Sequence, residues 1–566
     1  MQHVLRSPFG RIFNKVTRGK VLSPITSSFS TNSSVISSDF IVRCPYDDVV
    51  IPKTRFYDHV FQNFPKYGKK IALIDGVTGR EYSYNEVQES VVNIASGLVR
   101  SGMQKGDVLC LVAPNSPQVC MTYFATVACG GIFSSCNSSY TVDELVYQFK
   151  NSGSKYLATT PALLPTVREA ASKAGCVEKM IILGDDGGSG ERNNMMSYHN
   201  LVKDSGSRFP DDLKVNSTED IAILPYSSGT TGLPKGVMLT HYNVIANVCQ
   251  VDHNKFINFR DQNHFNICVL PFYHIYALII IFANNLYQGT TTLILPKFEP
   301  ETFLKTIQDY RCTDAPMVPP LLIFMAQHPS VEKYDLTSLK CVMSAAAPLS
   351  AELCAAVKSR TSIEVIRQGY GMTELSPLSH YCPMDADNPG SVGVPVLNTI
   401  CKVIDVETGE PLGPNCDGEV LVKGPQIMKG YLNNTKATAD TINNDGWIHT
   451  GDIGYYDENG FFYVTDRLKE LIKVKGLQVA PAELEALLLQ HPLISDVAVI
   501  GVEDERSGEL PRAFVVRSSD ELSEQEVEDF VKGRVAEHKQ LKGGVKFIEE
   551  IPKSASGKIL RRLLRK

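Results

Sequence analysis

The chain has 566 residues, more than one hydrophobic core usually supports, so two or more domains are expected. Apolar residues make up 43% of the chain and charged residues 21%, an ordinary globular balance that excludes a fibrous or wholly disordered protein. The formal net charge of −6 argues against a nucleic-acid partner, because such a domain normally carries a basic excess.

The first 38 residues have the composition of a mitochondrial transit peptide. They contain five Arg and Lys residues between Arg6 and Lys20 and many Ser and Thr, and no acidic residue occurs before Asp39. We therefore expect a matrix location; the alternative is a disordered basic tail on a cytoplasmic protein. The last residues, Leu564-Arg565-Lys566, do not match the Ser-Lys-Leu type of peroxisomal address.

From Asp39 onward, short apolar runs alternate with longer helical patterns, which is typical of an α/β fold. The runs at 71–74, 109–112 and 292–295 predict strands. A helix is predicted over 86–101, because its apolar residues recur at helical spacing and Gly102 follows as a stop signal. Strands at 497–502 and 513–516 and a helix over 523–535 predict a small α+β unit near the C-terminus.

Two further patterns argue against a transmembrane protein and against a cysteine-based metal site. The apolar stretch from Ala277 to Ala283 is far shorter than the roughly 18 to 20 residues that span a bilayer, so no transmembrane helix is predicted. The 14 cysteines lie between Cys44 and Cys416 without a C-x-x-C pair or a His/Cys cluster at zinc spacing. We interpret them as reduced and mostly buried thiols.

The segment 224–236, Leu-Pro-Tyr-Ser-Ser-Gly-Thr-Thr-Gly-Leu-Pro-Lys-Gly, has the features of a phosphate-binding loop. Glycines let backbone N–H groups turn toward an anion, hydroxyls add donors, and the lysine supplies positive charge. It is not a Walker A loop, because Gly236 follows the lysine. The residues predicted to hold the phosphates are Ser227, Ser228, Gly229, Thr230, Thr231, Gly232 and Lys235.

This loop resembles the signature of the adenylate-forming superfamily of acyl-CoA ligases, luciferases and peptide-synthetase adenylation domains. Further motifs of that superfamily follow in order at 368–374 (Gln-Gly-Tyr-Gly-Met-Thr-Glu), 446–452, 466–473 and 552–558. The segments 272–276 and 478–485 resemble the 4-coumarate:CoA ligase-like branch. The resemblance implies a large N-terminal region of α/β subdomains over 39–465, with the ATP and acyl sites, and a small mobile α+β domain over 466–566.

The implied activity is that of an ATP-dependent acyl-CoA ligase, which joins an acid to coenzyme A through an acyl-adenylate and releases AMP and pyrophosphate, with Mg²⁺ as metal. The acceptor is expected to be free CoA, because no carrier-like motif follows Lys566. The acid is expected to be a medium-chain fatty acid or an aryl, hydroxycinnamate-like acid. Plant 4-coumarate ligases carry Lys-Ser-Gly where this chain has Met343-Ser344-Ala345, which argues against a hydroxycinnamate preference.

The resemblance also assigns the nucleotide contacts. Tyr370 stacks on adenine, Thr373 contacts the α-phosphate, and Asp452 has two acceptor oxygens suited to a ribose diol. Arg467 lies near the same sugar, and Glu374 holds Mg²⁺ together with Thr231. The remaining nucleotide-binding residues are Ala345, Ala346, Ala347, Pro348, Gln368, Gly369, Gly371 and Met372.

Lys558 is the residue expected to stabilise charge in the adenylation step. The small domain then rotates about a hinge at Lys469 and brings Lys473 and Gln478 to the site for thioester formation, with Lys475 and Gly476 placing CoA. His274 is assigned a catalytic role and a place in the acyl pocket; outside the motif it would be interpreted as a core histidine. The acyl-pocket residues are His274, Tyr276, Ala345, Gly371, Pro377 and Leu378.

Two rival functions stay open. A luciferase-like monooxygenase shares the adenylation step but uses oxygen on the adenylate, although 274–276 is more similar to the ligases. A catalytically silent nucleotide-binding protein would be expected to have lost Lys558 or Glu374, and both are present.

Overall fold

The computed structural model describes residues 35–184, 194–227, 233–256, 264–386, 388–475, 477–504, 506–554 and 557–565. The side chains of Gln478 and Arg562 also lie outside this description. Almost all of the predicted transit segment is therefore outside it, as are residues 228–232 and Gly476 of the predicted site. All the described residues belong to one unit, which begins at Ser34.

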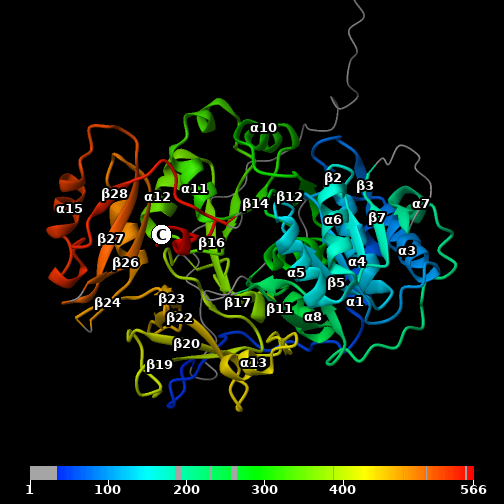
Figure 1. The fold of residues 1–566 in the computed structure, drawn as a ribbon, viewed down its shortest axis with the longest axis horizontal. Helices are drawn as coiled ribbons and strands as arrows, with labels where there is room; N and C mark the ends of the chain where they lie inside the picture. The colour runs from blue at the N-terminus through cyan, green and yellow to red at the C-terminus, as the bar shows by residue number, and fades with distance from the viewer. Residues whose placement is uncertain are drawn as a thin grey trace, which may run out of the picture. The chain divides into compact units, whose positions relative to one another are not determined.

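The first sheet has nine strands within the described residues, and its middle strands are parallel, as the α/β pattern predicts (Figure 1). The run at 109–112 forms β4, which is buried along its whole length, as strands of a parallel sheet covered on both faces are. In spatial order the strands are β10 (Tyr226–Ser227), β11 (Lys235–Thr240), β9 (Ile221–Ile223), β5 (Ile132–Cys136), β4 (Val108–Val112), β6 (Ser154–Thr159), β7 (Lys179–Ile182) and β8 (Met195–Ser197), with β21 (Gly430–Tyr431) beside β11.

The second sheet also has nine strands in the described part of the chain. It contains the predicted run 71–74 in β2 and most of the predicted run 292–295 in β13, which ends at Ile294. Its six central strands are parallel, and β3, β17 and β18 pair antiparallel at the two edges. In spatial order the strands are β18 (Val394–Pro395), β17 (Leu378–Tyr381), β16 (Val365–Gly371), β15 (Cys341–Ser344), β14 (Asp314–Met317), β12 (Phe265–Cys268), β13 (Thr291–Ile294), β2 (Ile71–Asp75) and β3 (Glu81–Ser83).

Helices connect most of the parallel strands, and the predicted helix at 86–101 is α3. It begins at Tyr84, two residues earlier than expected, because Ser83 forms a capping box with Glu86. The helices up to residue 441 are α1 (Phe56–Phe61), α2 (Phe64–Tyr67), α3 (Tyr84–Arg100), α4 (Pro117–Ala128), α5 (Val142–Ser152), α6 (Leu164–Ala174), α7 (Tyr198–Val202), α8 (His241–Val251), the π-helix η1 (Tyr276–Ala283), α9 (Asn284–Gln288), α10 (Pro300–Tyr310), α11 (Pro319–Gln327), η2 (Pro329–Lys333), α12 (Ala351–Arg360), η3 (Thr373–Leu375) and α13 (Thr435–Thr441).

The third sheet is antiparallel and has five strands within the described residues. Its interior is a separate apolar cluster that includes Val403, Val420 and Phe462. The strand at its edge ends on Arg467, two residues before the predicted hinge at Lys469. In spatial order the strands are β1 (Val42–Arg43), β19 (Ile400–Ile404), β20 (Gly418–Lys423), β22 (Ile448–Tyr456) and β23 (Phe462–Arg467).

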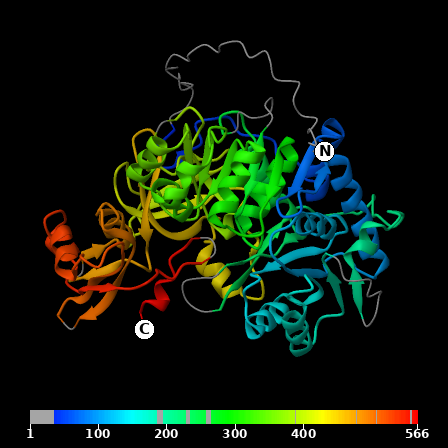
Figure 2. The same ribbon diagram turned by 90° about the horizontal axis from the view of Figure 1, so that it is seen from above.

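The C-terminal segment forms the predicted small α+β unit around a core of its own (Figure 2). Its strands are longer than predicted, because β26 and β27 continue as one hairpin as far as the pair Asp504↔Gly508. The predicted helix at 523–535 is α15; Ser523 caps it, and it ends at Lys532 before Gly533. The elements are β24 (Ile472–Val474), β25 (Leu477–Val479), α14 (Pro481–Leu488), β26 (Ile494–Asp504), β27 (Gly508–Arg517), α15 (Glu524–Lys532), η4 (Glu537–Lys539), β28 (Val545–Phe547) and η5 (Arg561–Leu563).

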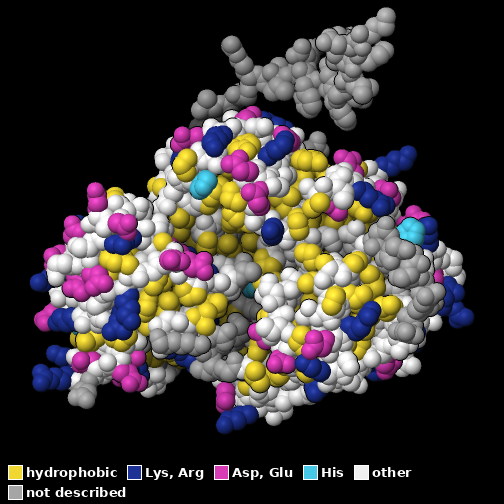
Figure 3. All heavy atoms as spheres, turned by 45° about the horizontal axis from the view of Figure 1, so that its top comes forward, with side chains coloured by type: hydrophobic (Ala, Val, Ile, Leu, Met, Phe, Trp, Pro, Cys, Tyr) yellow, Lys and Arg dark blue, Asp and Glu magenta, His cyan; other side chains and the backbone are white. Residues whose placement is uncertain are grey.

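Burial agrees with the interpretation of the cysteines and of the apolar stretch. Every cysteine is a free thiol, and only Cys416 is classed as exposed. Residues 277–283 are buried in η1, and no helix in the described ranges has the length and hydropathy of a membrane span. Lys and Arg side chains alternate with Asp and Glu over the face shown in Figure 3 and do not gather into one patch there.

Candidate active site

Glu374 lies beside the start of the predicted phosphate loop. It is buried, with 4% of its surface exposed, and one carboxylate oxygen accepts hydrogen bonds from Ser227 Oγ (2.9 Å) and Tyr431 Oη (2.7 Å). The ammonium of Lys235 lies 4.7 Å from the centre of the Tyr431 ring. Ser227 therefore contacts the predicted metal-binding carboxylate directly, and Lys235 lies near it through Tyr431. Ser228, Gly229, Thr230, Thr231 and Gly232 lie outside the described residues.

The predicted nucleoside contacts are joined to one another. Tyr370 donates its phenol to Asp452 Oδ2 over 2.7 Å, and Arg467 Nε lies 3.2 Å from Asp452 Oδ1. Asp452 faces Arg467 in the register of β22 and β23, so the sheet itself sets that pair. Burial, together with the Asp452 charge, raises the pKa of Tyr370 well above its ordinary value, which keeps the phenol a donor at neutral pH.

The segment 345–348 follows β15 and is tied to β16 by one side chain. Gln368 exchanges two hydrogen bonds with the backbone of Leu349, accepting at 3.2 Å and donating at 3.1 Å. Ala346 has a φ of +76°, in the left-handed region that residues other than glycine rarely adopt. The carboxyl ends of parallel strands are the usual ligand edge of such a sheet, and Ala345, Ala347, Pro348, Met372 and Thr373 follow β15 and β16 at that edge.

Close packing of neighbouring residues leaves no room for a side chain at the glycines of β16. A Cβ on Gly371 would lie 1.9 Å from the Pro377 carbonyl oxygen, and one on Gly369 would lie 2.8 Å from Leu378. Neither glycine could carry a side chain without movement of its neighbour. The predicted nucleotide strand and the predicted acyl-pocket residues Pro377 and Leu378 are therefore in direct contact.

His274 and Tyr276 line a small hollow together with Ala346 and Val318. Burial, with a smaller effect of the Lys558 charge, lowers the pKa of His274 to about 4, so the imidazole is neutral at physiological pH. Tyr276 donates its phenol to the Met343 backbone oxygen over 3.2 Å. The structure thus brings the predicted acyl-pocket residues to the same strand ends as the nucleotide residues.

Lys558 is close enough to this centre to share its electrostatics. Burial, with a smaller effect of the neighbouring Arg467 charge, lowers the pKa of Lys558 to about 8. The negative charges of Asp452, Glu470 and Glu374 act to raise this pKa and only partly offset the decrease. Its loop is in close contact with α11, since a Cβ on Gly557 would lie 3.0 Å from Pro320. The C-terminal lysine is therefore placed with residues from three of the other motifs.

The residues expected to act in thioester formation lie elsewhere on the C-terminal unit. Lys473 in β24 and Lys475 after it are exposed, as is Lys469 between β23 and β24. Lys473 faces Gln478 in the register of β24 and β25, and the Lys473 backbone amide donates to Glu509. Lys475 has a φ of +51°.

Sequence reasoning missed two residues at the site. Tyr431 joins Lys235 to Glu374, but a lone tyrosine after a glycine carries no signal of that role. Arg561 lies three residues after Lys558 in the sequence. It contacts Glu470 Oε2 at 2.5 Å and both carboxylate oxygens of Glu485 at 2.7 and 2.8 Å. In the sequence it is one of several basic residues near the C-terminus, and nothing there distinguishes it.

Comparisons with known proteins match most of the chain. The family model described as AMP-binding enzyme matches residues 60–432, and the model for the AMP-binding enzyme C-terminal domain matches 483–558. The chain is 42% identical over 535 residues to 4-coumarate–CoA ligase 1 of Petroselinum crispum, covering 93% of this chain and 96% of that protein. It is 39% identical over 532 residues to probable 4-coumarate–CoA ligase 1 of Dictyostelium discoideum, covering 92% and 96%.

Solved structures share the fold. The crystal structure of ATP-bound MatB from Rhodopseudomonas palustris superposes with a TM-score of 0.80 at 29% identity, covering 90% of this chain and 98% of that one. The anthranilate CoA ligase AuaEII in complex with anthranoyl-AMP superposes with a TM-score of 0.81 at 24% identity, covering 91% and 97%. The mixed α/β architecture with a small C-terminal unit is therefore the fold that the sequence predicted.

Proposed function

The chain belongs to the family of AMP-binding enzymes, and from this premise we propose how its residues carry out the reaction of an AMP-forming acid–CoA ligase. An acid, ATP and CoA are converted to an acyl-CoA, AMP and pyrophosphate through an acyl-adenylate. The observation that carries the assignment of residues is that the charges of Arg467, Asp452 and Glu374 act on the pKa of Lys558, and that Arg467 Nε lies 3.2 Å from Asp452.

In the first half-reaction the substrate carboxylate oxygen attacks the α-phosphorus of ATP, and the bond to the β-phosphate oxygen breaks as pyrophosphate leaves. Negative charge spreads over the oxygens of the transferred group, and a cation already in place stabilises it without reorganisation. We assign that cation to Lys558. Tyr370, Asp452 and Arg467 position the nucleoside, and Ser227 and Lys235 hold phosphate oxygens.

The residues present also fit a divalent cation. A buried carboxylate that already attracts two hydroxyl donors is a hard oxygen ligand, the type that Mg²⁺ takes beside nucleotide phosphates. Glu374 would hold the ion, with Thr231 as its second protein ligand. Such an ion would neutralise charge on the pyrophosphate as it leaves.

In the second half-reaction the CoA sulfur attacks the acyl carbonyl and AMP leaves, while the thiol proton passes to solvent. Lys473 and Gln478 are assigned to this step, and Lys475 and Gly476 to CoA placement. We propose that the C-terminal unit reorients about Lys469 to bring them in, because Lys473 and Lys475 are exposed while Lys558 occupies the centre. The boundary at 466 predicted from the sequence is part of this proposal.

We propose that the acid substrate is a medium-chain fatty acid or an aryl acid.

We propose that the protein is located in the mitochondrial matrix. This location rests on the composition of residues 1–38 alone. Import of the full chain into isolated mitochondria, followed by N-terminal sequencing of the protected product, tests it. A product that stays sensitive to external protease would contradict a matrix location.

The activity is tested with purified protein, ATP, Mg²⁺ and CoA across short, medium, long and aryl acids. Acyl-CoA and AMP should form in equal amounts with at least one class of acid. Formation of AMP that needs oxygen but not CoA would favour the luciferase-like rival. ATP binding without turnover of any acid would favour the silent nucleotide-binding protein.

A further inference from the structure

The predicted phosphate loop begins and ends on two short segments that pair with each other. We call residues 226–227 and 234–236 the loop stems. Ser227 on the first stem faces Lys235 on the second in the antiparallel register of β10 and β11. These are the two described residues assigned to phosphate oxygens, so whatever holds the stems also sets the positions of both groups.

One helix from an earlier part of the chain contacts both stems. Tyr147 and Asn151 lie four residues apart in α5 and therefore on the same face of that helix. Tyr147 donates its phenol to the Pro234 carbonyl oxygen over 2.8 Å. Since Pro234 directly precedes Lys235, this hydrogen bond fixes the backbone from which the lysine side chain extends.

The first stem is held in the same way by the second residue of this face. Tyr226 donates its phenol to Asn151 Oδ1 over 2.7 Å, and Tyr226 directly precedes Ser227. Burial raises the pKa of Tyr226, so the phenol keeps its proton at neutral pH. The Tyr226 ring also packs on the opposite stem, because a Cβ on Gly236 would lie 3.2 Å from it.

The helix is itself fixed to the first sheet. Leu145 and Phe149 are buried in an apolar cluster with residues of β4, β5 and β6. Between them Gln148, which is 2% exposed, donates to the Ser135 carbonyl oxygen at 3.0 Å. Its amide also lies 3.3 Å from the hydroxyl of Ser134, the neighbouring residue in β5. The helix therefore offers the stems a rigid support.

These contacts differ in kind from those on the other side of the loop. There the Ser227 hydroxyl donates to Glu374, and the Lys235 ammonium lies over the Tyr431 ring. The bonds from α5 involve neither that hydroxyl nor that ammonium. They can therefore persist unchanged when both groups turn to phosphate oxygens.

We propose that Tyr147 and Asn151 are positioning residues for the polyphosphate of ATP. By holding the loop stems, they keep the Ser227 hydroxyl and the Lys235 ammonium in place before the nucleotide arrives. Groups that are ordered in advance bind more tightly, because binding no longer has to restrict their motion. The inference rests on the proposed function, in which the stems hold phosphate oxygens, and adds two residues that none of the motifs contains.

The affinities of the full-length protein for ATP and for AMP, measured by titration calorimetry with Mg²⁺ present, test the proposal. AMP lacks the two phosphates assigned to the loop. Tyr147→Phe and Asn151→Ala should each raise the Kd for ATP roughly three- to tenfold, the usual effect of losing one neutral hydrogen bond, and leave the Kd for AMP unchanged. The ratio of the two constants within one preparation does not depend on the fraction of folded protein.

Two further measurements separate positioning from a general structural role. Tyr226→Phe removes the donor of the bond that Asn151→Ala breaks, so the double variant should bind ATP no more weakly than either single variant. Tyr147→Phe breaks a different bond, and its effect should multiply with that of Asn151→Ala. Conversion of preformed adenylate to acyl-CoA should keep its rate in every variant, because that step involves no pyrophosphate.

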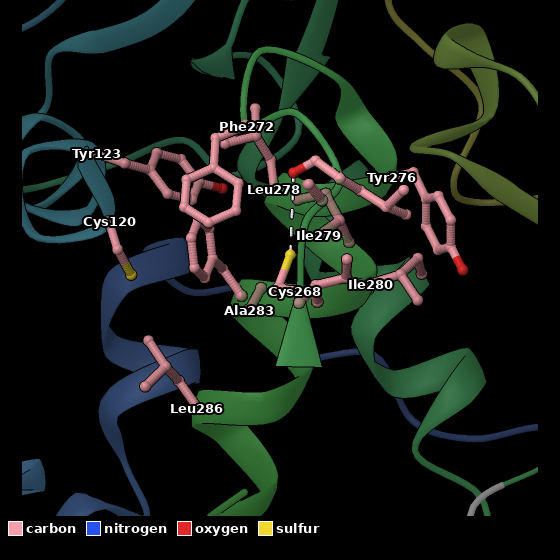
Figure 4. Packing of buried hydrophobic residues seen from close by; sticks show 14 of the residues in the cluster. Cys120, Tyr123, Cys268, Phe272, Tyr276, Leu278, Ile279, Ile280, Ala283 and Leu286 are labelled. Carbon is pink, nitrogen blue, oxygen red and sulfur yellow. Dashed lines mark hydrogen bonds between the residues drawn. The ribbon is translucent and has the colours of Figure 1, made fainter. Parts of the chain in front are cut away.

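The matched control is Tyr123→Phe, which removes the same atom from another buried tyrosine. Figure 4 shows Tyr123 among the buried hydrophobic residues of the main core. Its hydroxyl has no hydrogen-bond partner in the part of the chain that the structure describes. Both affinities of this variant should equal those of the unaltered protein.

Two results would overturn the inference and leave the ligase assignment intact. Equal weakening of ATP and AMP binding would mean that α5 supports the fold in general. Unchanged ATP binding in Tyr147→Phe, Asn151→Ala and Tyr226→Phe would mean that the stems hold their positions without the helix. ATP binding with the expected ratios but turnover of no acid would overturn the ligase function alone, and absence of ATP binding by the unaltered protein would overturn both.

Discussion

The phenol of Tyr370 donates a hydrogen bond of 2.7 Å to Asp452, so the residue assigned to adenine holds the residue assigned to ribose. Tyr370→Phe removes this bond to a charged acceptor, a contact worth about 1.5–3 kcal/mol. The KM for ATP should rise roughly tenfold while kcat changes little, because the contact orients bound nucleotide. Steady-state kinetics with varied ATP checks this. Tyr463→Phe, which loses a bond to Asn388 instead, is the control and should behave as the unaltered enzyme.

Lys558→Ala should slow formation of the acyl-adenylate by on the order of 10² to 10³, the usual effect of removing one group that stabilises developing charge. Conversion of preformed adenylate to acyl-CoA should change far less. Rapid-quench measurement of each half-reaction separates the two. Lys542→Ala is the control, since that lysine pairs with Glu537 on the surface. Equal loss in both half-reactions would remove Lys558 from its assigned role.

The pH dependence of adenylation follows from the same lysine. Burial lowers the pKa of Lys558 to about 8, and only the ammonium form stabilises the reaction. The rate should therefore be constant below pH 8 and fall above it by roughly tenfold per pH unit. Single-turnover rates from pH 6 to 10 measure the profile. Lys558→Arg should abolish the fall, because a guanidinium keeps its proton over this range; an unchanged fall would point to another group.

The dependence of the rate on Mg²⁺ concentration tests the proposed role of Glu374 as a metal ligand. Glu374→Gln keeps the shape of the side chain and loses its charge, so the Mg²⁺ concentration for half-maximal rate should rise by roughly 10-fold or more. High Mg²⁺ should restore part of the rate. Titrations after treatment with chelator give both values. The exposed Glu364→Gln is the control, and a shift of the same size there would argue against a metal ligand at Glu374.

Arg561→Met should destabilise the C-terminal unit by about 3–5 kcal/mol, because it leaves two carboxylates without their shared cation. Arg561, Glu470 and Glu485 are only 11%, 17% and 11% exposed. Denaturant unfolding followed in the C-terminal unit measures the loss, and adenylation should fall with it as the Lys558 loop loses its anchor. The exposed Arg534→Met should cost less than 1 kcal/mol.

Local patterns in the sequence predicted which strands and helices exist better than they predicted where those elements end. The apolar runs located β2, β4 and β13, since a buried parallel strand needs little more than apolar residues in sequence. The hairpin of β26 and β27 extends past its predicted ends, because backbone pairing continues through polar residues that carry no strand signal. Element ends were therefore the weaker part of the prediction.

Packing between distant elements was not predicted from the sequence. Asn266, Asn284 and Arg367 lie in β12, α9 and β16, and each taken alone would be expected at the surface. The structure places all three around one hollow, the two strand residues through the sheet and Asn284 through α9. Residues whose position depends on such packing leave no local pattern.

The ion pairs of Arg561 have a consequence for the order of events. They bind the chain just after Lys558 to Glu485 in α14 and to Glu470, the residue after the predicted hinge. Any reorientation of the C-terminal unit is therefore expected to move Lys558 with it. Lys473 belongs to the same unit, because β24 pairs with β27. If the unit reorients about Lys469 as proposed, Lys558 and Lys473 are expected to reach the reacting atoms in turn and not together. Thioester formation would then have to wait until Lys558 has left the site.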